Sequence, residues 1–179
     1  MTRIGSVYAQ ALYDLAKDES ISTDILGELR SLGAIFSENA DYLRLLSTPN
    51  LPKDERCGIL DETFSGRVHE YVLNFLKILT EKGYIRYFGD CIEAYRQLYN
   101  DDNGILPVKV VTAAAITAEQ EQRLASKLNS ITGKTVEIEN KIDPGCIGGV
   151  LLDYDGKRVD DTVRHRLDAV RSLLKNTML

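Results

Sequence analysis

Apolar residues in the first hundred positions recur at helical spacing, in runs separated by short polar segments. The first run lines one face of a helix for about four turns. Its members are Ile4, Val7, Tyr8, Ala11, Leu12, Leu15 and Ala16. The same spacing predicts helices over 25–36 and 41–47, and a fourth that begins after Pro52, because the two prolines of TPNLP interrupt helical hydrogen bonding.

The segment 68–80 is apolar around almost its whole circumference, which predicts a helix in the middle of a bundle. Its apolar positions are Val68, Tyr71, Val72, Leu73, Phe75, Leu76, Ile78 and Leu79. Apolar spacing over 84–99 indicates a sixth helix, which ends in the polar run 100–104. Together these runs predict a six-helix bundle over residues 1–103.

After residue 104 the apolar period changes from helical to strand-like. Residues 105–115 are a strand candidate, 117–133 an amphipathic helix, and 135–142 a second strand in which apolar and polar residues alternate. The apolar stripe of the predicted helix consists of Leu124, Leu128 and Ile131. This order predicts a small mixed β/α domain over residues 104–179.

The end of the chain predicts a β-hairpin and a last helix. The Asp155-Gly156 pair is typical of a type I′ turn, which sets Leu152 opposite Val159. The apolar stripe of the last helix is Val163, Leu167, Val170 and Leu174. The predicted fold class is therefore α+β, with a six-helix bundle followed by a mixed β/α domain that carries a hairpin and a C-terminal helix.

Composition and charge narrow the class of protein. The 179 residues are 44% hydrophobic and 27% charged, an ordinary soluble composition. The N-terminus shows no apolar signal core, so we expect the chain to stay in the compartment where it is made. Residues 1–103 carry 11 Lys and Arg against 17 Asp and Glu, and residues 104–179 carry 11 against 10. This balance predicts no nucleic-acid partner, since proteins that bind nucleic acids contact the phosphate backbone with clustered Lys and Arg side chains.

Few residues are placed to carry out chemistry. The cysteines Cys57, Cys91 and Cys146 are far apart and form no CxxC, so we expect buried thiols rather than disulfides or a zinc site. His69 and His165 lie in different halves of the chain and offer little basis for metal or triad chemistry. We therefore expect no catalytic residue, no metal and no cofactor.

The stretch ITGKTVEIENKIDPGCIGG contains a possible phosphate loop. A Walker loop needs Gly-x-x-x-x-Gly-Lys-Ser/Thr after a strand and before a helix. Gly133-Lys134-Thr135 has Leu128 in place of the first glycine, with a helix predicted before it and a strand after. Gly133 therefore fits a helix end better. A small nucleotide-binding enzyme or regulator that uses Gly133-Lys134-Thr135 is the less favoured alternative.

Two other clusters are interpreted as structural. The glycines Gly145, Gly148 and Gly149 precede a strand, where a turn, a bulge or a close backbone approach is more common than a dinucleotide site. The acidic residues around the hairpin lack the glycine and glutamate spacing of a calcium loop. They are Asp153, Asp155, Asp160 and Asp161.

Four short motifs occur in order along the chain: Tyr8-Ala9-Gln10-Ala11-Leu12, Asn74-Phe75-Leu76, Ile147-Gly148-Gly149 and Val163-Arg164-His165-Arg166-Leu167. Each is weak alone, but the ordered set is specific. It resembles the delta subunit of F-type ATP synthases, the family of the mitochondrial oligomycin-sensitivity-conferring protein. The resemblance covers essentially the whole chain and departs from the usual pattern at Glu81-Lys82-Gly83-Tyr84-Ile85, where the family has a polar or basic turn.

The resemblance implies a non-catalytic stator subunit that ties the F1 head to the peripheral stalk, so that rotary torque from proton flow drives ATP synthesis. It implies that residues 1–103 bind the N-terminal segment of an alpha subunit and that residues 104–179 join the b subunits. One copy per complex is expected, as a peripheral protein on the cytoplasmic side of the bacterial cell membrane.

The head contact is expected in a groove beside the first and fifth predicted helices, because an incoming amphipathic helix can cover an apolar side left open there. The candidate residues are Tyr8, Ala11, Leu12, Leu15, Phe75 and Leu79, with the alternative that they form only bundle core. The candidates for the stalk contact lie on the last helix and are Val163, Arg164, Leu167 and Arg171.

Overall fold

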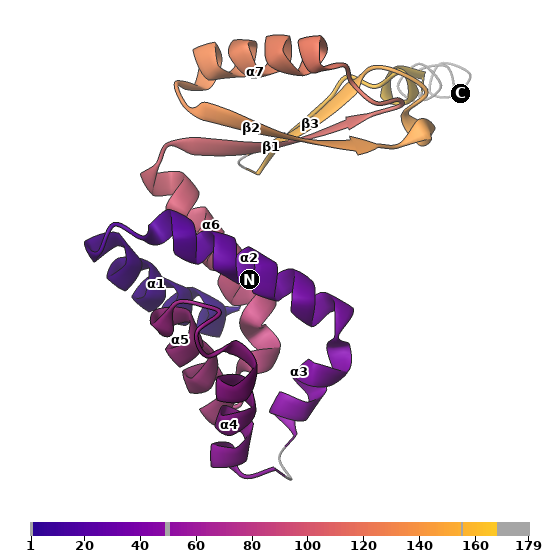
Figure 1. Cartoon of the computed structure of the whole chain (residues 1–179). Helices are drawn as coiled ribbons and strands as arrows, with labels where there is room; N and C mark the ends of the chain where they lie inside the picture. Colours follow the sequence, from indigo (N-terminus) through magenta and orange to yellow (C-terminus); the bar gives the residue numbers. More distant parts are fainter. Residues whose placement is uncertain (1, 49–50, 155, 168–179) are drawn as a thin grey trace. The chain divides into compact units, whose positions relative to one another are not determined.

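The chain forms two compact units, Met1–Tyr99 and Asn100–Leu179. The structure is a computed structural model that describes residues 2–48, 51–154 and 156–167 (Figure 1). The described part of the first unit is helical, and the second contains a four-stranded sheet. The predicted α+β class is confirmed.

Six α-helices make up the first unit, as predicted. They are α1 (Arg3–Asp18), α2 (Ser22–Glu38), α3 (Ala40–Ser47), α4 (Lys53–Phe64), α5 (Glu70–Glu81) and α6 (Phe88–Asp102). A 3-10 turn, η1 (Ile85–Tyr87), precedes α6 where the sequence had predicted continuous helix. Helix α6 continues through Asp102, so most of the polar run 100–104, in which the sixth helix was predicted to end, is helical.

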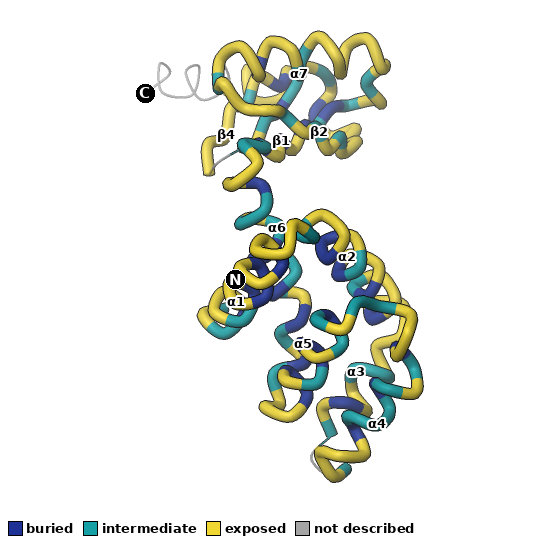
Figure 2. Tube along the Cα trace, turned by 60° about the vertical axis from the view of Figure 1, so that its left-hand side comes forward, coloured by how far each residue is buried: buried dark blue, intermediate teal, exposed yellow. Residues whose placement is uncertain are grey.

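The core of the first unit is formed by the inner faces of all six helices (Figure 2). Phe36 of α2 is the aromatic centre of this core. Its ring centroid lies 5.2 Å from that of Phe88, 6.0 Å from that of Phe64 and 5.8 Å from that of Tyr42. Such edge-to-face and stacked pairs add specific attraction to the burial of apolar surface.

The face of α1 that packs inward differs from the predicted one. Its buried residues are Gly5, Ala9, Leu12, Tyr13 and Ala16. Val7 and Leu15 are instead 61% and 52% exposed. Apolar residues occupy two neighbouring stripes of this helix, and the helical period alone does not distinguish the stripe that meets the core.

Helix α5 is not enclosed on all sides, contrary to the prediction from its composition. It buries Val72, Phe75, Leu76 and Leu79, whereas Ile78 is 45% exposed. A helix that is apolar nearly all round is expected to have neighbours all round. In the first unit one side of α5 is left open.

A buried cation joins three helices of the bundle. Arg56 of α4 donates hydrogen bonds from Nη1 to the carbonyl oxygens of Leu46 (3.0 Å) and Thr80 (3.4 Å). Both carbonyls lie in the last turns of their helices, α3 and α5. Carbonyl groups at helix C-termini carry partial negative charge and favour a cation, so Arg56 stabilises both helix ends.

Gly5 allows α1 to pack directly on α6. A Cβ at this position would lie 2.9 Å from Cβ of Asp90 and 3.1 Å from its carbonyl carbon. We expect Gly5→Ala to lower the free energy of unfolding by about 1–3 kcal/mol, because the added methyl group pushes the helices apart. Gly27→Ala in α2, which has no atom within 4 Å of the added carbon, should instead raise it by about 0.5–1 kcal/mol through helix propensity. Urea unfolding measures both, and equal effects would contradict the close approach.

The second unit is a mixed sheet in the order β2-β1-β3-β4. Its elements are β1 (Ile105–Thr112), α7 (Ala118–Thr132), β2 (Thr135–Ile142), η2 (Pro144–Cys146), β3 (Val150–Tyr154) and β4 (Lys157–Asp160). β1 and β2 are parallel, and α7 forms the crossover that a parallel pair requires. β3 is antiparallel to β1 and to β4. The predicted strands and helix are confirmed.

The hairpin has the predicted register. Leu152 pairs with Val159, and Tyr154 pairs with Lys157. Gly156 has the positive φ, 69°, that the predicted turn needs at this position, and Asp155 lies outside the described residues. Residues 163–167 are helical, and the rest of the predicted last helix lies outside the described residues.

A small core lies between the sheet and α7. Leu106, Val108 and Val110 alternate along β1 and belong to one buried cluster with Leu128 of α7. Ile131, which the sequence had placed in the same stripe, is exposed in the last turn of α7. The helical spacing therefore overestimated the buried stripe by one turn.

Candidate partner-binding surfaces

The Gly-Lys-Thr segment ends a helix. Gly133 has φ 69°, and its N–H donates to the carbonyl oxygen of Asn129 at 2.8 Å. Thr135 then begins β2. A phosphate loop requires a following helix whose N-terminus faces the anion, and a strand follows here. The interpretation of Gly133 as a helix end is confirmed.

The glycine cluster lets two backbone segments meet. Gly149 has φ 78°, and a Cβ there would lie 2.3 Å from the carbonyl oxygen of Asp161. The N–H of Asp161 donates to the carbonyl of Val150 (3.0 Å), and the N–H of Val163 to that of Gly148 (2.9 Å). The expected close backbone approach is confirmed, and it joins β3 to the start of the last helix.

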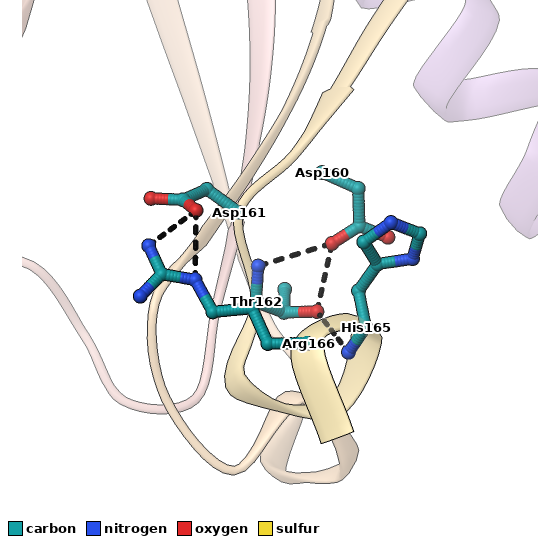
Figure 3. Close-up of polar contacts among 5 residues, drawn as sticks. All are labelled: Asp160, Asp161, Thr162, His165 and Arg166. Atoms are coloured by element: carbon teal, nitrogen blue, oxygen red, sulfur yellow. Dashed lines mark hydrogen bonds and ion pairs between the residues drawn. The ribbon is translucent and has the colours of Figure 1, made fainter. Parts of the chain in front are cut away.

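The acidic residues at the end of β4 and directly after it are engaged in local hydrogen bonds (Figure 3). The carboxylate of Asp160 accepts from the N–H (3.1 Å) and the hydroxyl (2.7 Å) of Thr162. The Thr162 hydroxyl oxygen in turn accepts from the N–H of His165 (3.2 Å), which caps the helix. Arg166 donates from Nε to Asp161 at 3.0 Å. Within the described ranges no group of three or more His, Cys, Asp or Glu is arranged to hold a metal ion.

These bonds predict a pH dependence of the helix start. The hydroxyl and the N–H of Thr162 hold the pKa of Asp160 below its usual value. Because the folded pKa is lowered, the stabilisation is complete above the unfolded value of about 3.9 and is lost as the pH falls through the folded pKa.

We expect Thr162→Val to raise the pKa of Asp160 toward its ordinary value, measured by carboxyl NMR. Asp90, whose pKa is lowered by hydrogen bonds from Thr2, is the internal control and should not change. An unchanged Asp160 titration in the variant would show that the Thr162 hydroxyl is not the cause.

The thiols are poorly suited to nucleophilic chemistry. Burial raises the pKa of Cys91 to about 11, which disfavours the reactive thiolate. Cys146 is also buried, but Cys57 is only half-buried, with Sγ 3.9 Å from the carboxylate of Glu81. The prediction of burial was therefore wrong for Cys57, whose position in α4 faces α5 at the edge of the bundle.

The structure divides the head-contact candidates into two groups. Leu12, Phe75 and Leu79 are at most 6% exposed and belong to the core, as the alternative held. Tyr8 is half-buried, and Ala11 and Leu15 are exposed. Leu12, Phe75 and Leu79 lie on the stripes that pack inward.

Exposed and half-buried apolar residues lie on both α1 and α5, and together we call them the α1/α5 surface. It consists of Val7, Tyr8, Ala11, Leu15 and Ile78. The helices are antiparallel, because Tyr71 near the start of α5 donates to Glu19 after α1, and Tyr8 in α1 contacts Tyr84 after α5 with ring centroids 6.0 Å apart. Val7 and Ile78 were not among the predicted contact residues, although both stood in the apolar patterns of their helices.

The stalk candidates lie on the segment 163–167. Val163, Arg164 and Leu167 are exposed there, and Val163 is bonded to the glycine cluster through its N–H. Arg171 lies outside the described residues. Both units therefore present apolar side chains to solvent at helical positions.

Two compact units that each expose apolar side chains fit a protein that contacts other proteins. The model of the family described as ATP synthase delta (OSCP) subunit matches residues 4–174. The subunit delta of Clostridioides difficile is 32% identical over 98% of this chain and 97% of its own. The chloroplast subunit delta of Emiliania huxleyi is 27% identical over 97% of each chain. The chain belongs to the ATP synthase delta (OSCP) family.

The fold is shared with one chain of a solved complex. A chain in the mitochondrial ATP synthase hexamer of Toxoplasma gondii superposes with a TM-score of 0.75 over 97% of this chain and 98% of that one, at 18% identity. As a member of its family, the present chain is a non-catalytic stator subunit that links F1 to the peripheral stalk in the membrane-bound complex. None of the described helices has the length and apolar character to cross a bilayer.

Proposed function

We propose that the first unit holds the F1 head by binding the N-terminal segment of an alpha subunit on the α1/α5 surface. The observation that carries this proposal is the row of exposed apolar side chains at helical spacing on α1, beside the exposed Ile78 of α5. Such a row favours a partner helix that lays its apolar face on the α1/α5 surface.

The charge of the first unit supports a basic partner. Residues 1–99 carry 11 Lys and Arg against 15 Asp and Glu, and Asp18 and Glu19 end α1 next to the apolar row. An acidic rim accelerates the encounter with a cationic segment and penalises an acidic one. The alpha segment is therefore expected to carry Lys or Arg on its polar face.

The second unit is proposed to join the b subunits through the exposed side of segment 163–167. One copy of the chain then ties the head to the stalk on the cytoplasmic side of the cell membrane. The head is subject to torque from the rotating central stalk, and the tie keeps it stationary so that ATP synthesis can proceed. This role needs two separate contacts, one with the alpha subunit and one with the b subunits, and neither contact needs a catalytic residue.

The test is a pair of titrations of the full chain. An alpha N-terminal peptide and the soluble domain of b should each bind at one site, and neither should displace the other. Competition between them would contradict two separate contacts. Saturable binding of ATP with Mg²⁺ to the isolated chain would instead favour the nucleotide-binding alternative at Gly133-Lys134-Thr135.

A further inference from the structure

The exposed row on α1 carries opposite charges at its two ends. Its members recur at intervals of four residues, which places them along one side of the helix. All of them are exposed, and they are Arg3, Val7, Ala11, Leu15 and Glu19. The row therefore begins with a cation, continues through three apolar residues of the α1/α5 surface and ends with a carboxylate.

An exposed row on α5 is charged in the opposite order. Its members also recur every four residues, and they are Glu70, Asn74, Ile78 and Lys82. Because α1 and α5 are antiparallel, the carboxylate of Glu70 lies at the same end of the helix pair as that of Glu19. The cation Lys82 likewise lies at the same end as Arg3. The two rows together have a carboxylate end and a cation end.

Tyr71 joins the two rows at the carboxylate end. Its hydroxyl donates a hydrogen bond to the carboxylate of Glu19. This bond raises the pKa of Tyr71 above its ordinary value, and desolvation and the charges of Glu19 and Glu70 add to the effect. Both carboxylates therefore act on the same hydroxyl group. The last two turns of α1 add two more exposed carboxylates and one exposed cation, namely Asp14, Asp18 and Lys17.

Aromatic rings join the two helices at the cation end. The ring centroid of Tyr84 lies 6.0 Å from that of Tyr8 and 6.3 Å from that of Tyr87. The guanidinium group of Arg86 lies over Tyr87, 4.7 Å from the ring centroid. These contacts connect the exposed Arg86, which follows α5, to Tyr8 of the α1/α5 surface. Arg86 is thus a third cation at this end.

The carboxylates near the cation end are engaged within the bundle. Asp90 packs against the buried side of α1, since its Cβ lies 2.9 Å from the position of a Cβ at Gly5, and its carboxylate accepts from the N–H of Thr2 (3.1 Å). The carboxylate of Glu81 lies 3.9 Å from Sγ of Cys57 in α4. Among the described residues, no ion pair joins a carboxylate to any of the three cations of this end.

We propose that the α1/α5 surface accepts its partner helix in one direction, with the basic end of that helix at Glu19 and Glu70 and its acidic end at Arg3 and Lys82. The inference rests on the proposed head contact, in which this helix is the N-terminal segment of an alpha subunit. The dipoles of α1 and α5 oppose each other, because the helices are antiparallel, so the side-chain charges decide the direction. The reverse direction brings like charges together, which is unfavourable. An apolar stripe by itself can be covered in either direction.

The test inverts the charges of the row on α1 without changing the net charge. In the double variant Arg3→Glu with Asp18→Lys, each new side chain also suits its end of the helix dipole, so the melting temperature should not fall. The alpha N-terminal peptide should bind this variant about tenfold more weakly than the unsubstituted chain at low salt, and the difference should shrink as salt is added. A peptide in which Lys and Arg are exchanged with Asp and Glu should instead prefer the variant.

A matched control makes the same exchange on another helix. Lys53→Glu with Glu62→Lys alters exposed positions at the two ends of α4 and also keeps the net charge. It should leave the affinity for either peptide within about twofold, because α4 is not part of the α1/α5 surface. An independent readout is a nitroxide on the basic end of the bound alpha peptide. It should broaden the amide signals of residues 19 and 70 more than those of residues 3 and 82.

The outcomes separate the direction of binding from the contact itself. Equal affinity of the alpha peptide for the unsubstituted chain and for Arg3→Glu with Asp18→Lys overturns the inference and leaves the head contact in place. Weaker binding that the exchanged peptide does not restore, or broadening at residues 3 and 82 instead, also overturns it. If the unsubstituted chain does not bind the alpha peptide at all, the proposed head contact is overturned, and the inference with it.

Discussion

Gly149→Ala is expected to cost more than about 3 kcal/mol of stability in the second unit, because two unfavourable effects add. The new Cβ would lie 2.3 Å from the carbonyl oxygen of Asp161 and 2.9 Å from Cα of Thr162. Both are backbone atoms and cannot rotate away, so β3 and the start of the last helix have to separate. Amide hydrogen exchange in β3 and β4, together with urea unfolding, measures the loss.

Gly156→Ala is the matched control for this effect. Gly156 has a similar φ, 69°, but no atom lies within 4 Å of an added Cβ. Its substitution therefore adds only the conformational penalty of a left-handed residue, about 1–2 kcal/mol. Equal losses in the two variants would show that the close approach to Asp161 contributes nothing.

Leu15→Glu is expected to weaken binding of the head about thirtyfold or more while the first unit stays folded. The side chain is exposed on the α1/α5 surface, so a charge there costs little in the free chain but is desolvated in the complex. An anchor residue of an interface contributes about 2 kcal/mol or more, roughly a thirtyfold loss of affinity. Titration with the alpha N-terminal peptide measures binding, and circular dichroism confirms the fold.

Two variants on the same helix test this interpretation. Gln10→Glu makes the same change in charge at an exposed position that does not belong to the α1/α5 surface, and it should change the affinity far less than Leu15→Glu does. Leu12→Ala truncates a core residue and should lower stability by about 2–5 kcal/mol, with binding retained at temperatures where the chain is folded. Full affinity in Leu15→Glu would exclude the α1/α5 surface as the head contact.

The secondary structure was predictable because each element is encoded locally. The helices follow from apolar periods and proline positions, and the hairpin register follows from Asp155-Gly156. The orientation of α1 was not predictable, since Leu12 and Leu15 lie on adjacent apolar stripes and only the packing of other helices selects between them. The candidate head contact inherited this ambiguity, which is why core residues such as Phe75 and Leu79 stood among its candidates.

Long-range relations were also hidden in the sequence. The parallel pairing of β1 with β2 depends on the path of α7, which no local pattern specifies. The contact between Gly149 and Asp161 joins the residue just before β3 to the residue just after β4. The glycine cluster indicated a close approach but not its partner. Ile147 stood in the motif Ile147-Gly148-Gly149, but nothing in the sequence indicated its positive φ.

The joint at Gly149 has a mechanical consequence for a subunit that resists torque. The segment that starts the last helix is held to the sheet by the Asp161 to Val150 and Val163 to Gly148 hydrogen bonds, with no side chain between the two backbones. Atoms in close contact transmit strain with little compression. A force along that helix therefore reaches β3 through these two backbone hydrogen bonds. The stiffness of the link is set by the main chain and not by flexible side chains.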